Sequence, residues 1–366
     1  MIALWRDQIK SVVRLESKKT FFARRGLWIY VLAVLPILLF IGKAIVESSL
    51  HNRSVRMLQQ SEKPLTYQDL LAVKSGMTRE EVIALLGKPP LSSHWSGRRS
   101  HGQDVVPPVQ HENFEYSDGE NVLFVNLSDG KVDIIQIREA YNLGDESIMF
   151  AGVFQFFFLR LAVFFGCLGI FMNLFRGEIL DRSLHFYFLA PIRREVLLAG
   201  KFLAGLLATC VIFVTSEVLQ TVALLWPLTP RLRDLYLYHN HGLEHALVYV
   251  GVTVLASIGY GAFFLVAGML FRNPLLPAAA ILIWEAVNPF LPALLKQFSV
   301  IYYLKSLCPV DVPAANGTPP LLALLVSNPD PVSPPVAILG VMVVALIALY
   351  VSSVQVRRLE INYTTE

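Results

Sequence analysis

Three charged side chains lie within stretches of the sequence that are otherwise apolar. Arg160, Glu217 and Glu285 each interrupt such a stretch. A charge inside the hydrocarbon of a membrane is costly, so such side chains usually face the protein interior and pair with one another. We expect Arg160 to form an ion pair with Glu217 or Glu285 and to shape the outer part of a translocation path. The alternative is that Arg160 extends to the outer interface while both glutamates belong to a static buried network.

A histidine cluster is the one metal-like feature of the sequence. His239, His241 and His245 lie within seven residues of one another, together with a glutamate. Imidazole and carboxylate groups this close suit a transition metal. The spacing differs from that of zinc proteases, in which a glutamate directly follows the first of two histidines one helical turn apart. These histidines are therefore a weak candidate site, and the alternative is a polar interfacial loop, so we expect no bound metal.

The sequence lacks the residues that ATP hydrolysis requires. The Gly-Lys pairs at Gly87-Lys88 and Gly200-Lys201 have neither the upstream glycine nor the following serine or threonine of a phosphate-binding loop. Pairs of a nucleophile and a base, and paired carboxylates placed for hydrolysis, do not stand out either. A basic, aromatic-laced surface for nucleic acid is also missing. The sequence thus predicts a protein that is not an enzyme, has no cofactor and does not bind nucleic acid.

The composition indicates a membrane protein. Of 366 residues, 54% are hydrophobic and only 16% are charged, whereas soluble domains carry roughly 25% charged residues. Much of the surface must therefore face lipid. The three cysteines, Cys167, Cys210 and Cys308, are scattered and odd in number, which argues against a disulfide framework and against a zinc site.

Six stretches approach the roughly 20 apolar residues that a membrane-spanning helix needs. The fifth is the weakest, because it contains Pro277, Pro289 and Pro292. We expect it to be a span that is broken or partly re-entrant near Asn288-Pro289. The six predicted spans are residues 27–46, 154–175, 202–226, 246–271, 275–295 and 336–354.

The basic residues predict the orientation of these spans. They concentrate in the N-terminal stretch, the loop at residues 176–197, Arg272 and the C-terminal tail, all of which fall on one side if six spans are counted. Because short cytoplasmic loops are rich in lysine and arginine, both termini should be cytoplasmic and the membrane should be the bacterial inner membrane. Residues 1–26 have apolar residues at helical spacing between basic ones, which indicates an amphipathic helix at the cytoplasmic interface or an ordinary basic leader.

Residues 52–145 differ in composition and predict a small extracytoplasmic α+β domain inserted after the first helix, which we place at residues 27–51. Charged and polar residues are frequent there, and no apolar run is long enough to span. Two short helices are followed by three strands joined by Asp-Gly turns. The predicted helices cover residues 65–73 and 79–86, and the predicted strands cover residues 113–116, 121–127 and 131–137.

This inserted domain resembles the small outer-membrane lipoproteins of the BamE/OmlA/SmpA type. The residues that carry the resemblance are Ser75-Gly76-Met77-Thr78, Glu81-Val82 and Leu85-Leu86-Gly87-Lys88-Pro89, followed by Tyr116 and a closing strand at residues 132–137. One difference is that this domain has no cysteine to carry a lipid, so the flanking helices would anchor it. The resemblance implies a scaffold or binding module with an envelope partner, and no enzymatic activity.

The membrane part resembles the permease subunits of ABC transporters of the type-2 exporter class. The resemblance rests on Arg176-Gly177-Glu178-Ile179, Asp181-Arg182-Ser183, Phe188-Leu189-Ala190-Pro191-Ile192-Arg193-Arg194 and Gly200-Lys201. It is clearest over the first three spans, and such permeases usually have a smaller first external loop. The implied fold is a polytopic α-helical membrane protein with about six transmembrane helices, its permease domain covering residues 146–354 and its cytoplasmic tail residues 355–366.

The resemblance implies that a separate ABC ATPase subunit drives transport and that the chain forms a dimer with itself or with a paralogous permease. The loop at residues 176–197 would be the coupling segment that docks in a groove of the ATPase. The alternative is that this loop rests on the membrane surface. A rival interpretation is a membrane-anchored scaffold that acts in envelope assembly through the inserted domain. The candidate coupling residues are Glu178, Asp181, Arg182, Arg193 and Arg194.

Overall fold

The computed structural model describes residues 2–22, 26–97, 109–139, 142–180, 187, 189, 192–271, 273, 275–313 and 331–358. The chain divides into two compact units. We call Met1–Ile41, Ser147–Leu225 and Thr229–Glu366 the bundle unit. Gly42–Glu146 together with Trp226–Leu228 form the inserted unit.

Five helices in the described part of the chain are long and apolar enough to cross a membrane, which makes this a polytopic membrane protein. The second of the five is continuous but changes its winding, because a π-helix lies between two α-helical parts. The five are α2 (Leu27–Gln60), the span formed by α5 (Leu143–Gly152), η2 (Val153–Val163) and α6 (Phe164–Leu180), then α8 (Arg194–Leu225), α10 (Gly242–Leu270) and α15 (Pro334–Arg358).

The fifth predicted span is not a single membrane-crossing helix, and the predicted break at Asn288-Pro289 is confirmed. Helix α11 (Leu275–Val287) ends at the break and is followed by the 3₁₀ turn η4 (Asn288–Phe290). Proline has no N–H to donate and clashes with the preceding turn. At 13 residues, α11 is about 20 Å long, short of the roughly 30 Å hydrocarbon core. Two short helices follow, α12 (Ala293–Lys296) and α13 (Val300–Leu307).

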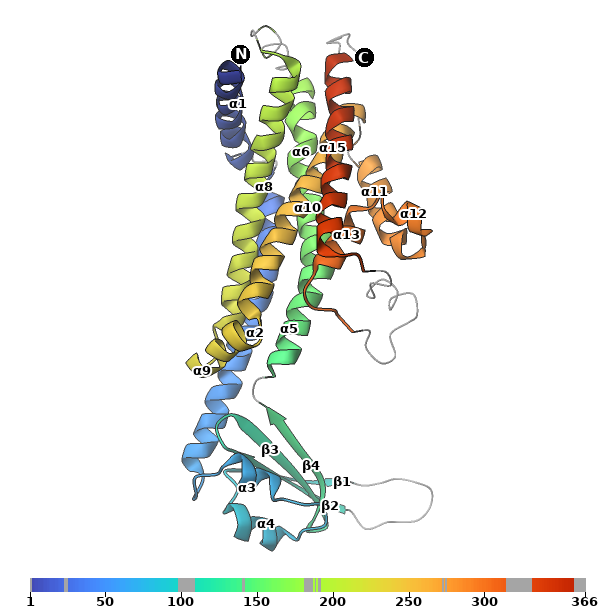
Figure 1. Ribbon diagram of the computed structural model, residues 1–366. Coiled ribbons are helices and arrows are strands. Elements are labelled where there is room, and N and C mark those ends of the chain that lie inside the picture. Colours follow the sequence, from blue (N-terminus) through green and yellow to red (C-terminus); the bar gives the residue numbers. More distant parts are fainter. Residues whose placement is uncertain are drawn as a thin grey trace. The chain divides into compact units, whose positions relative to one another are not determined.

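Helix α10 is the centre of the bundle unit and packs against α6, α8 and α15 (Figure 1). Small residues allow the close approach. A side chain at Gly261 would clash with the ring of Phe171, and one at Gly268 would lie 2.8 Å from the backbone oxygen of Met172. The small residues of α10, at a spacing typical of close helix contacts, are therefore used within this chain to pack α10 against α6.

Helix α1 (Ile2–Phe22) forms where the sequence predicts an amphipathic helix. It runs beside α8 (Figure 1). Buried Val12 of α1 lies against Gly200 of α8, where an added side chain would come within 2.8 Å of the Val12 Cβ atom. One face of α1 is thus packed on the bundle, while the opposite face is polar and exposed.

The inserted unit contains a four-stranded antiparallel sheet in the order β1-β2-β3-β4 and two short helices, α3 (Tyr67–Leu71) and α4 (Arg79–Leu86). The sequence predicts three strands and the sheet has four, so the predicted strand number is wrong: β1 lies outside the predicted strands. Its sequence, Leu-Ser-Ser-His-Trp-Ser-Gly, lacks the apolar alternation of a half-buried strand, which is tolerated because β1 pairs on one side only. The strands are β1 (Leu91–Gly97), β2 (Val109–Ser117), β3 (Asn121–Ser128) and β4 (Lys131–Glu139).

The inserted unit has a hydrophobic core of its own, in which Tyr116 is fully buried and donates a hydrogen bond to the carbonyl oxygen of Gly87 at 3.0 Å. Burial raises the pKa of the Tyr116 hydroxyl above its usual value. The predicted turns are present, with Gly119 and Gly130 at positive φ, a conformation that glycine adopts without a steric penalty. Thr78 and Glu81 form a capping box at the start of α4.

Helix α2 is longer than the predicted first span and continues to Gln60. Its last part belongs to the inserted unit. There the Ser54 hydroxyl donates to the carbonyl oxygen of Gly119 at 3.0 Å, and Arg53 forms an ion pair with Glu115 at 2.9 Å. The sheet therefore holds the end of α2, which explains why the helix continues past the apolar stretch.

Candidate functional site: a buried ion network at one end of the bundle unit

A buried ammonium group pairs with two carboxylates at one end of the bundle unit. Lys201 of α8 is completely buried, and its Nζ atom lies 2.9 Å from a Glu16 oxygen, 2.8 Å from a Glu178 oxygen and 2.9 Å from the carbonyl oxygen of Leu174. Glu16 comes from α1, and Glu178 lies near the end of α6. Three segments that are far apart in the sequence thus meet at one cation.

Two further side chains complete this cluster, which we call the Lys201 network (Glu16, Lys19, Glu178, Tyr187 and Lys201). Lys19 donates to Glu178 at 3.2 Å and to the Tyr187 hydroxyl at 2.9 Å, and Tyr187 donates to Glu16 at 2.6 Å. Burial and the neighbouring carboxylates raise the pKa of Tyr187 above its usual value, so it is a neutral donor. Burial alone would raise the pKa of Glu16, but the Lys201 ammonium and the bonds from Tyr187 and Lys201 bring it below the usual value.

The predicted coupling residues have different places around this network. Glu178 is 6% exposed and is part of it. The Arg193 guanidinium lies 5.1 Å from the centre of the Trp5 ring, and Arg194 donates to the carbonyl oxygens of Val356 and Arg357 at the end of α15. Asp181 and Arg182 lie outside the described residues. A role of these residues in coupling stays a prediction.

Several helix ends gather at this end of the bundle unit. Besides the contacts of the Lys201 network, Arg176 near the end of α6 donates to the carbonyl oxygen of Phe271 at 3.1 Å, directly after α10. Arg357 forms an ion pair with Glu195 at 2.9 Å. Basic side chains thus satisfy the free carbonyl groups at the ends of α10 and α15, as is favourable at a helix C-terminus.

Of the three predicted intramembrane charges, two lie close together. Arg160 of η2 interacts electrostatically with Glu285 of α11, and its guanidinium lies 5.7 Å from the Phe156 ring. The Glu285 carboxylate accepts hydrogen bonds from the Val300 and Ile301 amides at 3.0 and 3.1 Å and from the Ser299 hydroxyl. Glu285 therefore caps the first turn of α13 from a neighbouring helix. Whether it lines a translocation path stays a prediction.

Glu217 lies elsewhere in the bundle unit. It is 1% exposed, accepts a hydrogen bond from the Thr221 hydroxyl at 3.2 Å and interacts electrostatically with Tyr249 of α10. Among the described residues, Arg160 thus interacts electrostatically with Glu285, and an ion pair of Arg160 with either glutamate stays a prediction.

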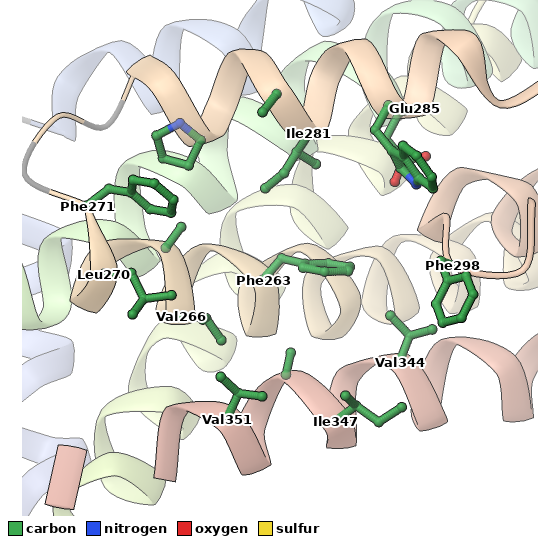
Figure 2. A pocket seen from close by; sticks show the side chains of 15 residues that line it. Phe263, Val266, Leu270, Phe271, Ile281, Glu285, Phe298, Val344, Ile347 and Val351 are labelled. Carbon is green, nitrogen blue, oxygen red and sulfur yellow. The ribbon is translucent and has the colours of Figure 1, made fainter. Parts of the chain in front are cut away.

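An apolar pocket of about 560 Å³ opens between α10, α11 and α15. Figure 2 shows Phe263 and Leu270 of α10, Ile281 of α11 and Ile347 of α15 around it. Glu285 is the one charged side chain of the lining, and its carboxylate is already engaged by α13. The volume lies in the range of small-molecule sites, and the lining suits a hydrocarbon group.

The histidine cluster is not assembled as a metal site in the described residues, where no group of three suitable ligands is found. His241 pairs instead with Glu244, at 3.1 Å between Nδ1 and the carboxylate oxygen, and both side chains are exposed. His239 ends the short π-helix η3 (Leu235–His239), which follows α9 (Pro230–Asp234), and His245 lies in the first turns of α10.

No protein-family model, curated protein or solved structure matches this chain. What the protein does has to be inferred from its own side chains and their contacts. Among these, the Lys201 network includes residues that sequence reasoning did not select as site residues, namely Glu16, Lys19, Tyr187 and Lys201. The available signal was Lys201 itself, a lysine seven residues into an apolar helix.

Proposed function

We propose that this chain is the membrane-spanning subunit of an ATP-driven transporter. A separate ATPase subunit would drive its conformational changes, and the chain would form a dimer with a second copy or with a paralogue. The observation that carries the proposal is the ion pair between Glu178 and Lys201, at 2.8 Å. These two residues belong to two separate motifs behind the resemblance to type-2 exporter permeases. Their pairing gives one structural reason for both motifs.

The Lys201 network suits a coupling role because it holds the chain before, within and after the segment at residues 181–191, through Glu178, Tyr187 and Lys201. Glu178 precedes this segment, and Arg194 follows it and holds the end of α15. A buried ion pair is costly to separate. A push on the segment would therefore move α6 and α8 with it instead of being absorbed locally, as an ATPase-driven transporter requires.

The contacts of the predicted coupling residues decide which of them can test docking of the ATPase. Glu178 and Arg194 are structural, so reversing their charge would disturb folding as well as docking. Asp181 and Arg182 are the predicted coupling residues that lie outside the described residues. We would purify tagged protein carrying Asp181→Lys or Arg182→Glu in mild detergent and identify bound proteins by mass spectrometry. An ABC ATPase should accompany the wild type and be lost from both variants.

The matched control is Arg231→Glu, which makes the same charge change at an exposed arginine of α9. This variant should retain the ATPase. Unchanged melting temperatures of all variants would show that the loss is not due to misfolding. Absence of any ATPase from the wild-type purification would contradict the proposal, as would its retention by both loop variants.

A second candidate function is a membrane-anchored scaffold acting through the inserted unit. The observation in its favour is Trp95 on β1, which is 55% exposed and stacks on His111 with ring centres 4.3 Å apart. An exposed tryptophan is typical of a binding surface. Under this alternative, Trp95→Ala abolishes function while Arg182→Glu leaves it intact, and envelope proteins instead of an ATPase accompany the wild type.

A further inference from the structure

Helix α8 carries a carboxylate that is buried without the partners an ionised group needs. One Glu217 oxygen accepts the Thr221 hydrogen bond, and the other has no hydrogen-bond partner in the described part of the chain. No basic side chain among the described residues forms an ion pair with it. Removing an unpaired carboxylate from water is far more costly than removing a neutral group.

A buried acceptor three residues along α8 from Glu217 has no donor among the described residues. Gln220, one turn along α8 from Glu217, donates its amide nitrogen to the carbonyl and hydroxyl oxygens of Ser216, both at 3.2 Å. The Ser216 hydroxyl itself donates to the carbonyl oxygen of Ala33. These acceptors fix the orientation of the Gln220 amide. Its buried Oε1 atom therefore remains an acceptor with no donor among the described residues.

A proton on Glu217 removes this mismatch. An ionised carboxylate only accepts hydrogen bonds, whereas a carboxylic acid also donates one. Residues three apart are neighbours on one helical face, so an acid proton at Glu217 lies on the face that presents Gln220 Oε1. Tyr249 of α10 interacts electrostatically with Glu217. Its hydroxyl is buried without a hydrogen-bond partner among the described residues and is neutral at physiological pH, so it can donate to the carboxyl group but cannot neutralise a charge there.

We infer that Glu217 is a proton-binding site inside the bundle unit and holds its proton as a neutral carboxylic acid at physiological pH. Glu285 is the natural comparison within the same chain. Its two oxygens accept three hydrogen bonds, and it interacts electrostatically with Arg160, so a charge on Glu285 has the stabilising partners that Glu217 lacks. The inference does not depend on an ATPase partner, and failure of either proposal leaves the other intact.

The experiment is infrared spectroscopy of the full-length protein in detergent micelles. The wild type minus Glu217→Gln difference spectrum should show the carbonyl stretch of a protonated carboxyl group, shifted by exchange into heavy water. The corresponding difference with Glu285→Gln should show loss of carboxylate absorption instead. The Glu217→Gln variant should keep the wild-type melting temperature because an amide resembles a neutral acid, whereas Glu285→Gln should melt lower.

Loss of carboxylate absorption from Glu217→Gln would overturn the inference. So would a carboxyl band that disappears when potassium in the buffer is replaced by sodium, since that would indicate a bound cation in place of a proton. If Glu217→Gln fails to fold, the wild type alone suffices. Dicyclohexylcarbodiimide, which modifies protonated carboxyl groups in apolar surroundings, should label Glu217 but not Glu285, and equal labelling of both or of neither would count against the site.

Discussion

Lys201 is the residue on which the end of the bundle unit depends most. Replacing it with methionine removes the buried cation of the Glu16 and Glu178 carboxylates and leaves them the half-exposed Lys19. Breaking a buried pair in this way costs about 3–5 kcal/mol. We expect Lys201→Met to lower the free energy of unfolding by this amount, measured by reversible unfolding in mixed detergent micelles.

The matched control for Lys201→Met is Lys10→Met, which alters an exposed lysine of α1 and should change stability little. The double variant Glu178→Gln/Lys201→Met should recover part of the loss, because one uncompensated charge is removed. Equal effects of the changes at Lys201 and Lys10 would show that the network contributes nothing.

Glu16 makes the stability of the network depend on pH. Because its pKa is lowered in the folded protein, its contribution is fully present above the unfolded pKa of about 4.3. It is lost as pH falls through the lower folded value. The difference in melting temperature between the wild type and Glu16→Gln should therefore be constant from about pH 5 to 7 and shrink below about pH 4. A difference that grows on acidification would contradict this assignment.

The individual site residues were only partly predictable from the sequence. The apolar surroundings of Glu285 were enough to indicate a buried charge, and Glu285 is buried and interacts electrostatically with Arg160. The pairing of Lys201 with Glu16 was not predictable, because the two are separated by 185 positions and depend on α1 packing along α8. Local patterns carry no information about such a contact, and Glu16 by itself looks like an ordinary surface residue of an amphipathic helix.

At the scale of single elements, the contact between α1 and α8 depends on one glycine. An alanine at Gly200 would meet the Val12 side chain at 2.7 Å, whereas one at Gly177 of α6 has no neighbour within 4 Å. Both changes improve helix propensity by about 1 kcal/mol, but only the first overpacks an interface. Gly200→Ala should be less stable than Gly177→Ala by about 1–3 kcal/mol in the same unfolding assay.

Equal stabilities of these two variants would mean that α1 can shift away from α8 without cost. Protease sensitivity of α1 in Gly200→Ala provides an independent readout. It should increase only if the α1 contact is what the substitution disturbs.

The broken segment α11–α13 raises the question of whether it lies in the membrane. Trp284 of α11 lines the apolar pocket and is 36% exposed. In a variant that keeps only this tryptophan, lipids with brominated acyl chains should quench its fluorescence strongly. The control variant keeps only Trp95 of the inserted unit and should be quenched little. Similar quenching of both would argue that α11 lies outside the hydrocarbon.

Element types were easier to predict than their ends. The five long spans and the last three strands follow from apolar length and alternation, which are local properties. Strand β1 does not, because its pairing with β2 depends on backbone hydrogen bonds that any sequence can make. The end of α2 at Gln60 was also unpredictable, since Ser54 and Arg53 gain their partners only when the sheet is folded.

At the scale of the whole molecule, the positions of the C-terminal ends of α10 and α15 indicate how many times the chain passes from one end of the bundle unit to the other. The end of α10 meets Arg176, and the end of α15 meets Arg194, so both helices end beside the Lys201 network. Since α15 is a long straight helix, it must begin at the opposite end. The chain between α10 and α15 therefore returns across the bundle unit, and α11 and α13 supply pieces of that return (Figure 1).

If the chain crosses an even number of times, both of its termini lie on the same side of the membrane. Single cysteines, placed in a variant whose three native cysteines are replaced, can test this. Lys10→Cys and Arg358→Cys should react with a membrane-impermeant maleimide from the same side. Arg231→Cys, between α8 and α10, should react from the other side. Labelling of positions 10 and 358 from opposite sides would contradict the return of the chain through α11 and α13, and would leave five crossings.

The Lys201 network can form only after Lys201 has been synthesised, which sets when α1 can dock on the bundle unit during translation. Glu16 leaves the ribosome 185 residues before the lysine that neutralises it, an interval of about 10–40 s at ordinary translation rates. During that interval two spans must be inserted and the whole inserted unit must be made between them. Helix α1 cannot form its contacts with Lys201 until this is done, so its docking follows the insertion of the first two spans.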